Sequence, residues 1–281
     1  MVAEVSPASP FNRVNALPPW ALARVPGLED GQPPLHIEAL GGGTVNLVYR
    51  VDSPQGRFTL RLDGEAWRRP GVDRARELAL HRVAAAGGIA PAIIAAVPEQ
   101  QGLLVTEFHE GRLWRAEDYG NPAWLHRLGE RLYRLHRLPP PRIALFDPLQ
   151  VGLGYVALAS SEHAAACASA MRRLEQDCKL LRHSEWPAAV VHGDLWEGNL
   201  LQGERLWLLD WEYAQLTDPL MDVACLLAYY PQAASHQGEL LAAAGFDARL
   251  HHQALIARVD IYRMLTWLWR LARGEATIPP A

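Results

Sequence analysis

Lysine is almost absent from this chain of 281 residues. Lys179 is the only one, so arginine carries nearly all of the positive charge. This excludes the lysine-containing Walker pattern, which is the common glycine-rich phosphate loop. The formal net charge is −4, so no excess of positive charge favours nucleic acid as a partner.

Cysteine and long apolar runs are scarce as well. Cys167, Cys178 and Cys225 are widely spaced, odd in number and outside any Cys-x-x-Cys pair, which argues against a disulfide framework or a structural zinc site. No run of about 18 apolar residues occurs, so the sequence predicts no membrane span. Residues 1–20 lack a basic start followed by an apolar segment, so no signal peptide is expected. We therefore expect a soluble, cytoplasmic protein without a membrane partner.

Hydrophobic residues make up 49% of the chain and charged residues 21%, which is typical of a globular protein with a sizeable core. The length allows one large domain or two lobes. After a leader rich in proline and alanine, alternating apolar residues and turn residues predict a β-rich section with one long helix. Strands are expected over 36–40, 46–51, 57–62 and 102–111, and the helix over 72–87. The second and third strands form a hairpin around residues 52–56.

The pattern changes from about residue 121, where apolar residues recur at helical spacing. Helices are expected over 122–138, 162–184, 218–230 and 249–274. The fold class is therefore α+β. A small β-rich lobe, with the leader and a hinge strand, covers residues 1–108, and a larger, mainly helical lobe covers residues 109–281.

The loop VVHGDLWEGNLL, residues 190–201, gathers polar residues between apolar flanks. Asp194 follows a His-Gly pair, Asn199 comes five residues later, and Asp210 ends the next apolar run. One acid can accept the proton of an attacking hydroxyl, while an amide and a second carboxylate are hard oxygen ligands for Mg²⁺. The set predicts phosphoryl transfer. A tight turn with a satisfied Asn is the alternative interpretation of the first motif alone.

Three motifs occur in order: HGDLWEGN, LLDWEYA and DPLMDVA; GGGTVN, RARE and VTEF lie upstream. Together, over residues 40–271, they resemble the aminoglycoside phosphotransferase and choline kinase superfamily. The resemblance implies a bilobal, protein-kinase-like fold that uses ATP and Mg²⁺. It implies that Asp194 is the catalytic base, that Asn199 and Asp210 hold Mg²⁺, and that His192 and Asp222 support the loop.

One acid of the third motif has a structural interpretation instead. Asp218 precedes Pro219 at the start of an expected helix, where an aspartate caps the free amides. We therefore do not assign it to the chemistry.

The N-terminal lobe departs from the kinase pattern, which places a lysine on the third strand to hold the phosphates. This sequence has Arg61 at that position, with Glu77 as the matching helix acid. An arginine offers a planar fork of donors, so it can hold a phosphate and Glu77 together. The alternative is an exposed strand arginine and a solvated glutamate.

Two further nucleotide contacts follow from the resemblance. Gly41, Gly42 and Gly43 would let backbone amides approach the phosphates, although the third glycine of Gly-x-Gly-x-x-Gly is missing and a simple turn is the alternative. The VTEF motif matches the hinge between the lobes. There, backbone groups of Glu107 and Phe108 would meet adenine.

The acceptor is predicted from the second motif, which is closer to choline, ethanolamine and thiamine kinases than to aminoglycoside-modifying enzymes. By this match Tyr213 is a candidate for an aromatic cage, since aromatic faces suit an ammonium ion without strong donors. Trp269 matches one cage tryptophan, whereas the second falls on Thr266. Trp196 is placed to stack on a flat ring. Packing is the alternative role for any of the ten tryptophans.

The sequence therefore predicts an ATP- and Mg²⁺-dependent phosphotransferase acting on a small-molecule hydroxyl acceptor. A cationic amino alcohol such as choline, ethanolamine or thiamine is the expected acceptor. An aminoglycoside or amino-sugar kinase and a fructosamine-type kinase are the alternatives within enzymes. A pseudokinase that binds without catalysis is the alternative outside them, because the strand lysine is missing. The oligomeric state and the choice between ATP and GTP are left open.

Overall fold

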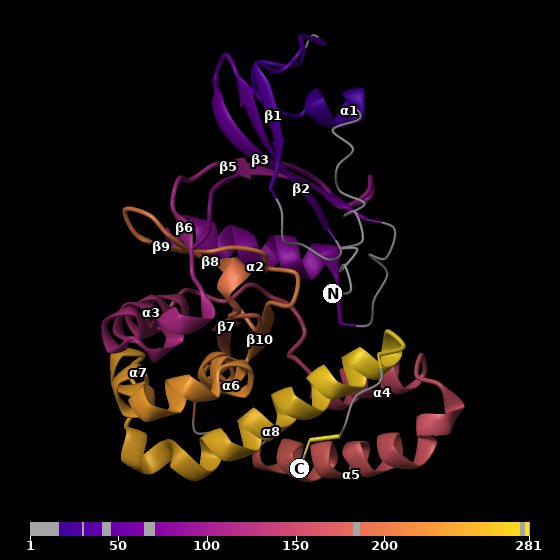
Figure 1. Cartoon of the computed structure of the whole chain (residues 1–281), viewed down its shortest axis with the longest axis vertical. Helices are drawn as coiled ribbons and strands as arrows, with labels where there is room; N and C mark the ends of the chain where they lie inside the picture. Colours follow the sequence, from indigo (N-terminus) through magenta and orange to yellow (C-terminus); the bar gives the residue numbers. More distant parts are fainter. Residues whose placement is uncertain are drawn as a thin grey trace, which may run out of the picture. The chain divides into compact units, whose positions relative to one another are not determined.

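A computed structural model of the chain describes residues 17–29, 31–40, 46–64, 71–181, 186–275 and 279–280 (Figure 1). The chain folds into two compact units. Unit 1 comprises residues 1–67 and 91–109, and unit 2 comprises residues 68–90 and 110–281. Residues 68–90 thus group with unit 2, whereas the boundary expected at residue 108 placed them before it. The functional assignment of the two lobes stays a prediction.

Unit 1 is built on a five-stranded antiparallel sheet with the order β1-β2-β3-β5-β4. Its strands are β1 (His36–Ala39), β2 (Asn46–Ser53), β3 (Gly56–Asp63), β4 (Ile93–Val97) and β5 (Leu103–Glu107). Strand β4 was not expected from the sequence. Its residues IIAAV do not alternate in polarity, so the period-2 signal of a half-buried strand is absent.

The hairpin of β2 and β3 confirms the expected pairing but has a tighter turn. Ser53 pairs with Gly56, so only two residues lie at the tip. Gly56 has φ +141°, which favours glycine because it carries no Cβ. On one side of unit 1, α1 (Pro19–Leu22) and the following turns bury Ala21, Val25 and Leu28 in the same apolar cluster as sheet residues such as Leu60.

Unit 2 is mainly helical and contains all four helices expected after residue 121. The helices of at least seven residues are α2 (Arg74–Ala86), α3 (Pro122–Leu135), α4 (Pro148–Val156), α5 (Ala164–Leu181), α6 (Leu220–Tyr229), α7 (Gln237–Ala243) and α8 (Ala248–Ala272). Helix α2 starts where Asp73 accepts the amides of Ala75 and Arg76, at 2.9 and 3.1 Å. Helices α4 and α7 were not expected.

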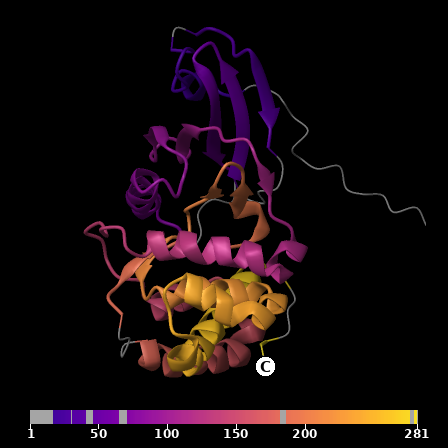
Figure 2. The same ribbon diagram turned by 90° about the vertical axis from the view of Figure 1, so that its left-hand side faces the viewer.

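The helices of unit 2 pack around one apolar core. Helix α3 buries Leu125, Leu128, Leu132 and Leu135, which recur every three or four residues along one face. Helix α3 packs on α7, and α8 packs on α5 and α6. Figures 1 and 2 show α8 running beside α5 along one side of the unit. Glycine at position 129 permits the α3–α7 contact, because a Cβ there would lie 2.5 Å from that of Ala243.

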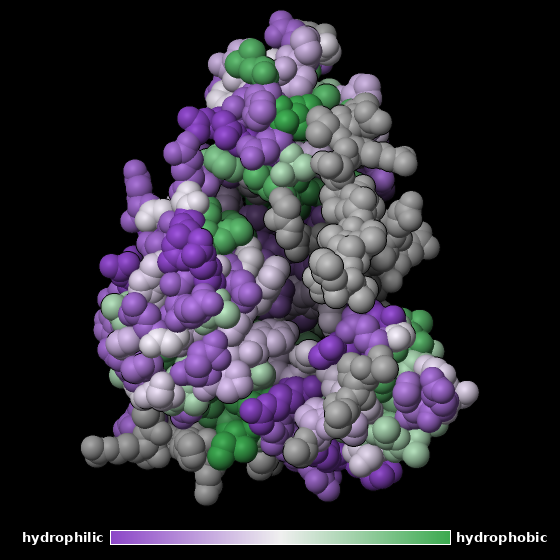
Figure 3. Space-filling view, in the orientation of Figure 1, coloured by the Kyte–Doolittle hydropathy of each residue, from purple (hydrophilic) through white to green (hydrophobic). Residues whose placement is uncertain are grey.

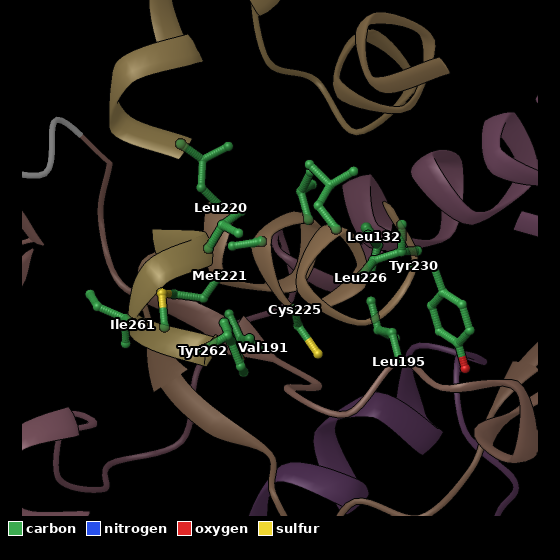
Figure 4. Packing of buried hydrophobic residues seen from close by; sticks show 14 of the residues in the cluster. Leu132, Val191, Leu195, Leu220, Met221, Cys225, Leu226, Tyr230, Ile261 and Tyr262 are labelled. Carbon is green, nitrogen blue, oxygen red and sulfur yellow. The ribbon is translucent and has the colours of Figure 1, made fainter. Parts of the chain in front are cut away.

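Unit 2 also contains two small antiparallel sheets, whose short strands flank its loops. In one, β7 (Ala189–Val191) pairs with β10 (Gln215–Thr217), and Val191 faces Gln215. In the other, β8 (Leu200–Gln202) lies between β6 (Arg112–Leu113) and β9 (Leu206–Leu208). Beneath them, Val191 and Leu195 point into the core together with Cys225 and Tyr262 from α6 and α8 (Figure 4).

The surface of unit 2 is mostly hydrophilic or of intermediate hydropathy on the face shown in Figure 3, with scattered hydrophobic patches. None of the helices within the described residues has the length and apolar character needed to cross a membrane. All three cysteines are described and buried, and none of them forms a disulfide.

Candidate active site

The loop that carries Asp194 is held at both ends by buried strands. It leaves β7, whose three residues are all buried, and enters β8 through the short 3₁₀ helix Glu197–Asn199. Strand β10 brings the chain back beside β7 after Asp210. The backbone hydrogen bond from Leu209 N to Asn199 O, 2.9 Å long, then ties the loop of Asp210 to that of Asp194.

Asp194 and Asn199 are in direct contact. The side-chain amide of Asn199 donates to the Asp194 carboxylate Oδ2 and to the Asp194 carbonyl, both at 2.9 Å. Burial, together with the Asp210 and Glu212 carboxylates, raises the pKa of Asp194 to about 8, against the lowering effect of the Asn199 bond. Asp194 as a whole residue is only partly buried, while its carboxyl group is desolvated.

Asp210 adopts a backbone conformation that is uncommon for a residue with a side chain. Its φ is +54°, in the left-handed region. An aspartate tolerates this region better than most residues but still at a cost, and such outliers cluster where a side chain must be aimed. The carboxylate of Asp210 acts electrostatically on Asp194, so the two acids belong to one site.

His192 and Asp222 hold the loop from below. His192 is fully buried; its Nε2 lies 2.8 Å from Leu209 O, and its Nδ1 accepts the Asp194 amide at 3.3 Å. The Asp222 carboxylate accepts the amides of His192 and Gly193, at 3.2 and 2.9 Å. It also contacts Nε2 of His136, the C-cap residue of α3, at 2.9 Å. The structure thus places both predicted support residues against the loop of Asp194; their roles in catalysis stay predictions.

Gly193 sits in a space that admits no other residue. Its φ is +76°, and a Cβ there would lie 2.7 Å from the Tyr213 carbonyl oxygen and 3.4 Å from Tyr262 Oη. The Gly193 carbonyl accepts a hydrogen bond from Cys225 Sγ at 3.4 Å. The HGD motif therefore needs glycine both for its backbone conformation and for the close approach of residue 213.

The donor set fits a hard cation with few protein ligands. Among the described residues, no group of three or more His, Cys, Asp or Glu side chains is arranged to hold a metal ion. The Asn199 amide nitrogen donates to Asp194, and the Asn199 amide oxygen and the Asp210 carboxylate are the hard oxygen donors of this set. Mg²⁺ keeps several waters and takes one or two carboxylates, so such a pair suits it. Burial is the main cause of the raised pKa of Asp194, and the Asp210 and Glu212 carboxylates add to it, so negative charge gathers around this side chain.

A buried ion triad includes Glu212, two residues after Asp210, and was not predicted from the sequence. Arg74 Nη1 of α2 contacts Glu77 Oε2 at 2.7 Å and Glu212 Oε2 at 3.2 Å, with all three side chains at most 7% exposed. Glu77 was expected to pair with Arg61. Arg61 belongs to unit 1 and Glu77 to unit 2, so that pairing stays a prediction. The i, i+3 spacing of Arg74 and Glu77 was a signal for their contact.

Unit 1 holds the other predicted nucleotide residues. Arg61 is buried in β3, where it pairs with Val48 and Leu104. The Glu107 amide donates to Ala92 O at 3.0 Å, and the Phe108 amide donates to Arg57 O at 3.2 Å. Both amides are thus hydrogen-bonded within unit 1, and the contact of these two residues with adenine stays a prediction. Gly41, Gly42 and Gly43 lie outside the described residues.

The predicted acceptor residues all lie in unit 2. Trp196 packs over Gly198, where a Cβ would lie 2.4 Å from the indole. Tyr213 is half-buried and follows Asp210 by three residues. Trp269 is half-buried on α8, and the Arg273 guanidinium lies 4.7 Å from its ring centroid, so this cation contacts one face of the indole.

Two stacked tyrosines, Tyr119 and Tyr230, support the part of the Asp194 loop that follows this residue. They were not predicted from the sequence. Tyr119 donates to the Leu195 carbonyl at 2.9 Å and stacks on Tyr230 at 3.6 Å. The Tyr230 hydroxyl accepts the Glu197 amide at 3.1 Å and donates to the Glu197 carboxylate. No motif signals these contacts, because residues more than 30 positions apart make them.

Asp218 has the structural role expected of it. Its carboxylate accepts the amide of Leu220 at 2.9 Å, and Arg258 Nε of α8 donates to it at 3.1 Å. These contacts fix the start of α6, which carries Asp222.

A family model described as the phosphotransferase enzyme family matches residues 36–265. A solved choline/ethanolamine kinase family protein from Mesorhizobium loti has a TM-score of 0.72 at 27% identity; the match covers 91% of this chain and 86% of that one. Choline kinase LicA from Streptococcus pneumoniae has a TM-score of 0.71 at 18% identity, covering 88% of both chains.

An aminoglycoside phosphotransferase, APH(4)-Ia, solved with AMP-PNP and hygromycin B, has a TM-score of 0.64 at 15% identity. This match covers 88% of this chain and 90% of that one. At 15% and 18% identity, APH(4)-Ia and LicA show only that they share a fold with this chain. The comparisons confirm the superfamily that the motifs resemble and the predicted protein-kinase-like α+β fold.

Proposed function

The chain belongs to the phosphotransferase enzyme family and transfers phosphate to a hydroxyl group of a small molecule; we propose that ATP is the donor and a cationic amino alcohol the acceptor. The observation that carries the proposal is the contact of Asp194 with Asn199 beside Asp210. It gathers a proton acceptor and two oxygen ligands in one loop system.

Asp194 is the proposed base. Its carboxylate would accept the proton of the acceptor hydroxyl as that oxygen attacks the terminal phosphate of ATP. Asn199 fixes its orientation through the 2.9 Å hydrogen bond. His192 and Asp222 fix the backbone beneath it. Little covalent chemistry is asked of these residues, because positioning dominates phosphoryl transfer.

Asn199 and Asp210 are the proposed ligands of Mg²⁺. When bound, the ion would neutralise charge on the phosphates. Positive charge beside Asp210 would also lower the pKa of Asp194 from about 8, so that its carboxylate is ionised at neutral pH. The left-handed backbone of Asp210 supports this role, since it directs the carboxylate at a conformational cost.

Nucleotide binding in related structures supports ATP as the donor. LicA has been solved with AMP and APH(4)-Ia with AMP-PNP. Another aminoglycoside phosphotransferase has been solved with GDP and kanamycin, which keeps GTP as an alternative donor. On this chain Arg61, Gly41, Gly42 and Gly43 are the proposed phosphate contacts, and backbone groups of Glu107 and Phe108 the adenine contacts.

The cationic acceptor is supported by Tyr213 and by the choline/ethanolamine kinase family protein at 27% identity. Tyr213 lies three residues after Asp210, and its backbone contacts Gly193 beside Asp194. An aromatic face attracts an ammonium ion by about 0.5–2 kcal/mol. Trp196 and Trp269 are further candidates. An aminoglycoside acceptor is the second candidate function, because APH(4)-Ia shares the fold.

The test is a screen for acceptor-dependent ATP consumption over choline, ethanolamine, thiamine, amino sugars, fructosamines and aminoglycosides. We expect a cationic amino alcohol to give the highest kcat/KM. Asp194→Asn and Asp210→Asn should fold normally and lower turnover about a hundredfold or more. Near-normal turnover by either variant would overturn its assigned role.

A matched pair of acceptors tests directly whether the enzyme recognises the positive charge of its acceptor. Choline and 3,3-dimethylbutanol have the same shape, but only choline is charged. We expect the enzyme to prefer choline, and Tyr213→Ala to raise the KM of choline about two- to thirtyfold while that of ATP stays constant. Equal use of both acceptors would contradict recognition of the acceptor's positive charge.

A further inference from the structure

The loop of Asp194 contains a short 3₁₀ helix whose first amide needs a partner from outside the loop. The helix spans Glu197–Asn199 and has Trp196 at its N-cap. The first amides of a helix have no partner within it, and an indole has no acceptor to offer them. The hydroxyl of Tyr230, the C-cap residue of α6, accepts the Glu197 amide at 3.1 Å. A phenol from another element therefore caps this helix.

Tyr230 also binds the side chain of Glu197. Its hydroxyl donates to the Glu197 carboxylate Oε2. A hydroxyl has one donor hydrogen and two acceptor lone pairs, so it can make both hydrogen bonds at once. One hydroxyl group thus fixes the backbone and the side chain of Glu197, and the orientation of this residue depends on it.

Tyr119 holds the peptide group on the other side of Trp196. Its hydroxyl donates to the Leu195 carbonyl at 2.9 Å, and its ring stacks on that of Tyr230 with an interplanar angle of 7°. Both tyrosines are buried, and Figure 4 shows Tyr230 beside Leu195 in the core. The two hydroxyls together fix the peptide groups before and after Trp196.

The tyrosine pair is anchored by contacts that do not involve the loop. Tyr119 lies in the 3₁₀ helix Ala116–Gly120. Gln232, two residues after Tyr230, donates through Nε2 to the Ala116 carbonyl at 3.0 Å. This hydrogen bond joins the two segments that carry the tyrosines. The pair is therefore a fixed support against which the loop is placed.

The segment held by the tyrosines connects two polar residues of the candidate site. Asp194 precedes it and Asn199 follows it, and the Asn199 side chain donates to the Asp194 carboxylate at 2.9 Å. The backbone amide of Asn199 donates to the Trp196 carbonyl at 2.9 Å. A shift of residues 195–197 would therefore move Asn199 relative to Asp194. Such shifts matter, because a misplacement of about 1 Å can lower a rate about a hundredfold.

We propose that Tyr230 and Glu197 are positioning residues for phosphoryl transfer, with Tyr119 as their support. Their hydrogen bonds set the place of Asn199 beside Asp194, so they act on turnover and on the metal rather than on the acceptor. This inference rests on the proposed function, since it concerns the roles proposed for Asp194 and Asn199.

Tyr230→Phe removes the hydroxyl and keeps the ring that stacks on Tyr119. We expect kcat to fall about tenfold and the Mg²⁺ concentration for half-maximal rate to rise about three- to tenfold, with the acceptor KM within twofold. Leu174→Val is the matched control, because Leu174 is fully buried on α5 and packs on Gly152 of α4. It should lower the Tm and leave the Mg²⁺ dependence constant. Equal changes of Mg²⁺ dependence in both variants would indicate a general loss of stability and overturn the proposal.

Two substitutions of Glu197 test the hydrogen bond itself. Glu197→Ala should lower kcat and weaken the Mg²⁺ dependence in the same direction as Tyr230→Phe. Glu197→Gln keeps an oxygen acceptor for the hydroxyl and should lie closer to wild type. The double variant Tyr230→Phe/Glu197→Ala should lose no more than Tyr230→Phe, since both changes remove the same contact. Additive losses, or a glutamine variant as slow as the alanine variant, would overturn the role of this hydrogen bond.

Hydrogen exchange tests the position of the loop without metal, nucleotide or turnover. In the protein alone, the amides of Glu197 and Asn199 should exchange about two- to tenfold faster in Tyr230→Phe than in wild type, because the lost hydrogen bonds no longer oppose opening. The amides of β7 should exchange at the same rate in both proteins. Unchanged exchange at Glu197 and Asn199 would show that the loop keeps its place without Tyr230 and overturn the proposal.

The possible outcomes separate this inference from the proposed function. If Asp194→Asn is inactive and Tyr230→Phe matches wild type in kcat and Mg²⁺ dependence, the positioning role is wrong while the kinase mechanism stands. If Asp194→Asn is active, the mechanism itself is wrong and this inference falls with it. Should Tyr230→Phe fail to fold, Glu197→Ala and Glu197→Gln carry the comparison; equal kcat values for these two would overturn the inference.

Discussion

The His192 imidazole Nε2 lies 2.8 Å from the Leu209 carbonyl oxygen, and this contact ties the loop of Asp194 to the residue before Asp210. The same ring accepts the Asp194 amide at Nδ1. The ring must therefore be neutral, with its proton on Nε2, and burial lowers its pKa accordingly. One side chain thus sets the backbone position of both acids.

Replacing His192 by phenylalanine keeps a ring of similar size beside Trp211, which now packs edge-on at 4.8 Å. It leaves the Leu209 carbonyl and the Asp194 amide without this partner. Each buried group left unsatisfied costs about 1–3 kcal/mol, so for these two groups we expect the free energy of unfolding to fall by about 2–6 kcal/mol. Turnover should fall at least about tenfold, because both acids lose their support. Denaturant titration and steady-state kinetics measure the two effects.

The pH dependence of stability gives an independent check on His192. Its folded pKa is lowered, so below the unfolded value of about 6.5 the unfolded chain binds a proton that the folded chain does not. Wild type should therefore lose stability as pH falls below about 6.5, by up to about 1.4 kcal/mol per pH unit from this residue. The phenylalanine variant should lack this component. An identical acid limb in both proteins would contradict a buried neutral His192.

Gly193→Ala tests the close approach of the loops. The change adds a Cβ at φ +76° and 2.7 Å from the Tyr213 carbonyl oxygen, a backbone atom that does not move easily. Gly274→Ala is the matched control, since Gly274 has φ +75° and no atom within 4 Å of the added Cβ. The control should cost about 1–2 kcal/mol of unfolding free energy, from the left-handed backbone alone. Gly193→Ala should cost at least about 1 kcal/mol more and lower turnover; equal costs would show that the contact is unimportant.

Arg74→Met tests the buried ion triad. The change leaves the Glu77 and Glu212 carboxylates buried without this arginine, so we expect the free energy of unfolding to fall by about 3–5 kcal/mol. Lys179→Met is the control, because the Lys179–Glu175 pair is more than half exposed and such pairs contribute about 0–1 kcal/mol. Chemical denaturation of both variants gives the comparison. A loss for Arg74→Met no larger than for the control would mean that water reaches the triad.

The sequence predicted elements where local pattern decides structure. The strands around Val51 and the face of α3 with Leu128 have clear periodicities, and both are found. Strand β4 and helix α7 were missed, because β4 has no alternation and α7 is only seven residues long. Such short elements are stabilised by their neighbours rather than by their own sequence.

The same difference between local sequence patterns and contacts among separate elements applies to the candidate site. Asp194 and Asn199 are five residues apart in one motif, so the sequence alone indicates that they lie close together. The contacts of Glu212 with Arg74 and of Tyr119 with Leu195 join separate elements, and no local pattern encodes them. Sequence reasoning identifies the residues that a short loop holds, whereas helix packing decides which side chains surround that loop.

Because β3 contains no lysine, we expect the Arg61 guanidinium to hold the phosphates. The residue is buried in that strand, and a guanidinium that holds phosphate contributes about 1.5–3 kcal/mol. Arg61→Ala should therefore raise the KM of ATP and the Kd of AMP-PNP about ten- to hundredfold and leave acceptor binding nearly constant. Arg61→Lys should recover only part of the loss, since lysine lacks the planar fork. Arg57→Ala, an exposed arginine of the same strand, is the control and should bind AMP-PNP like wild type. Thermal unfolding shows whether Arg61→Ala remains folded. Unchanged AMP-PNP binding in folded Arg61→Ala would place the phosphates elsewhere.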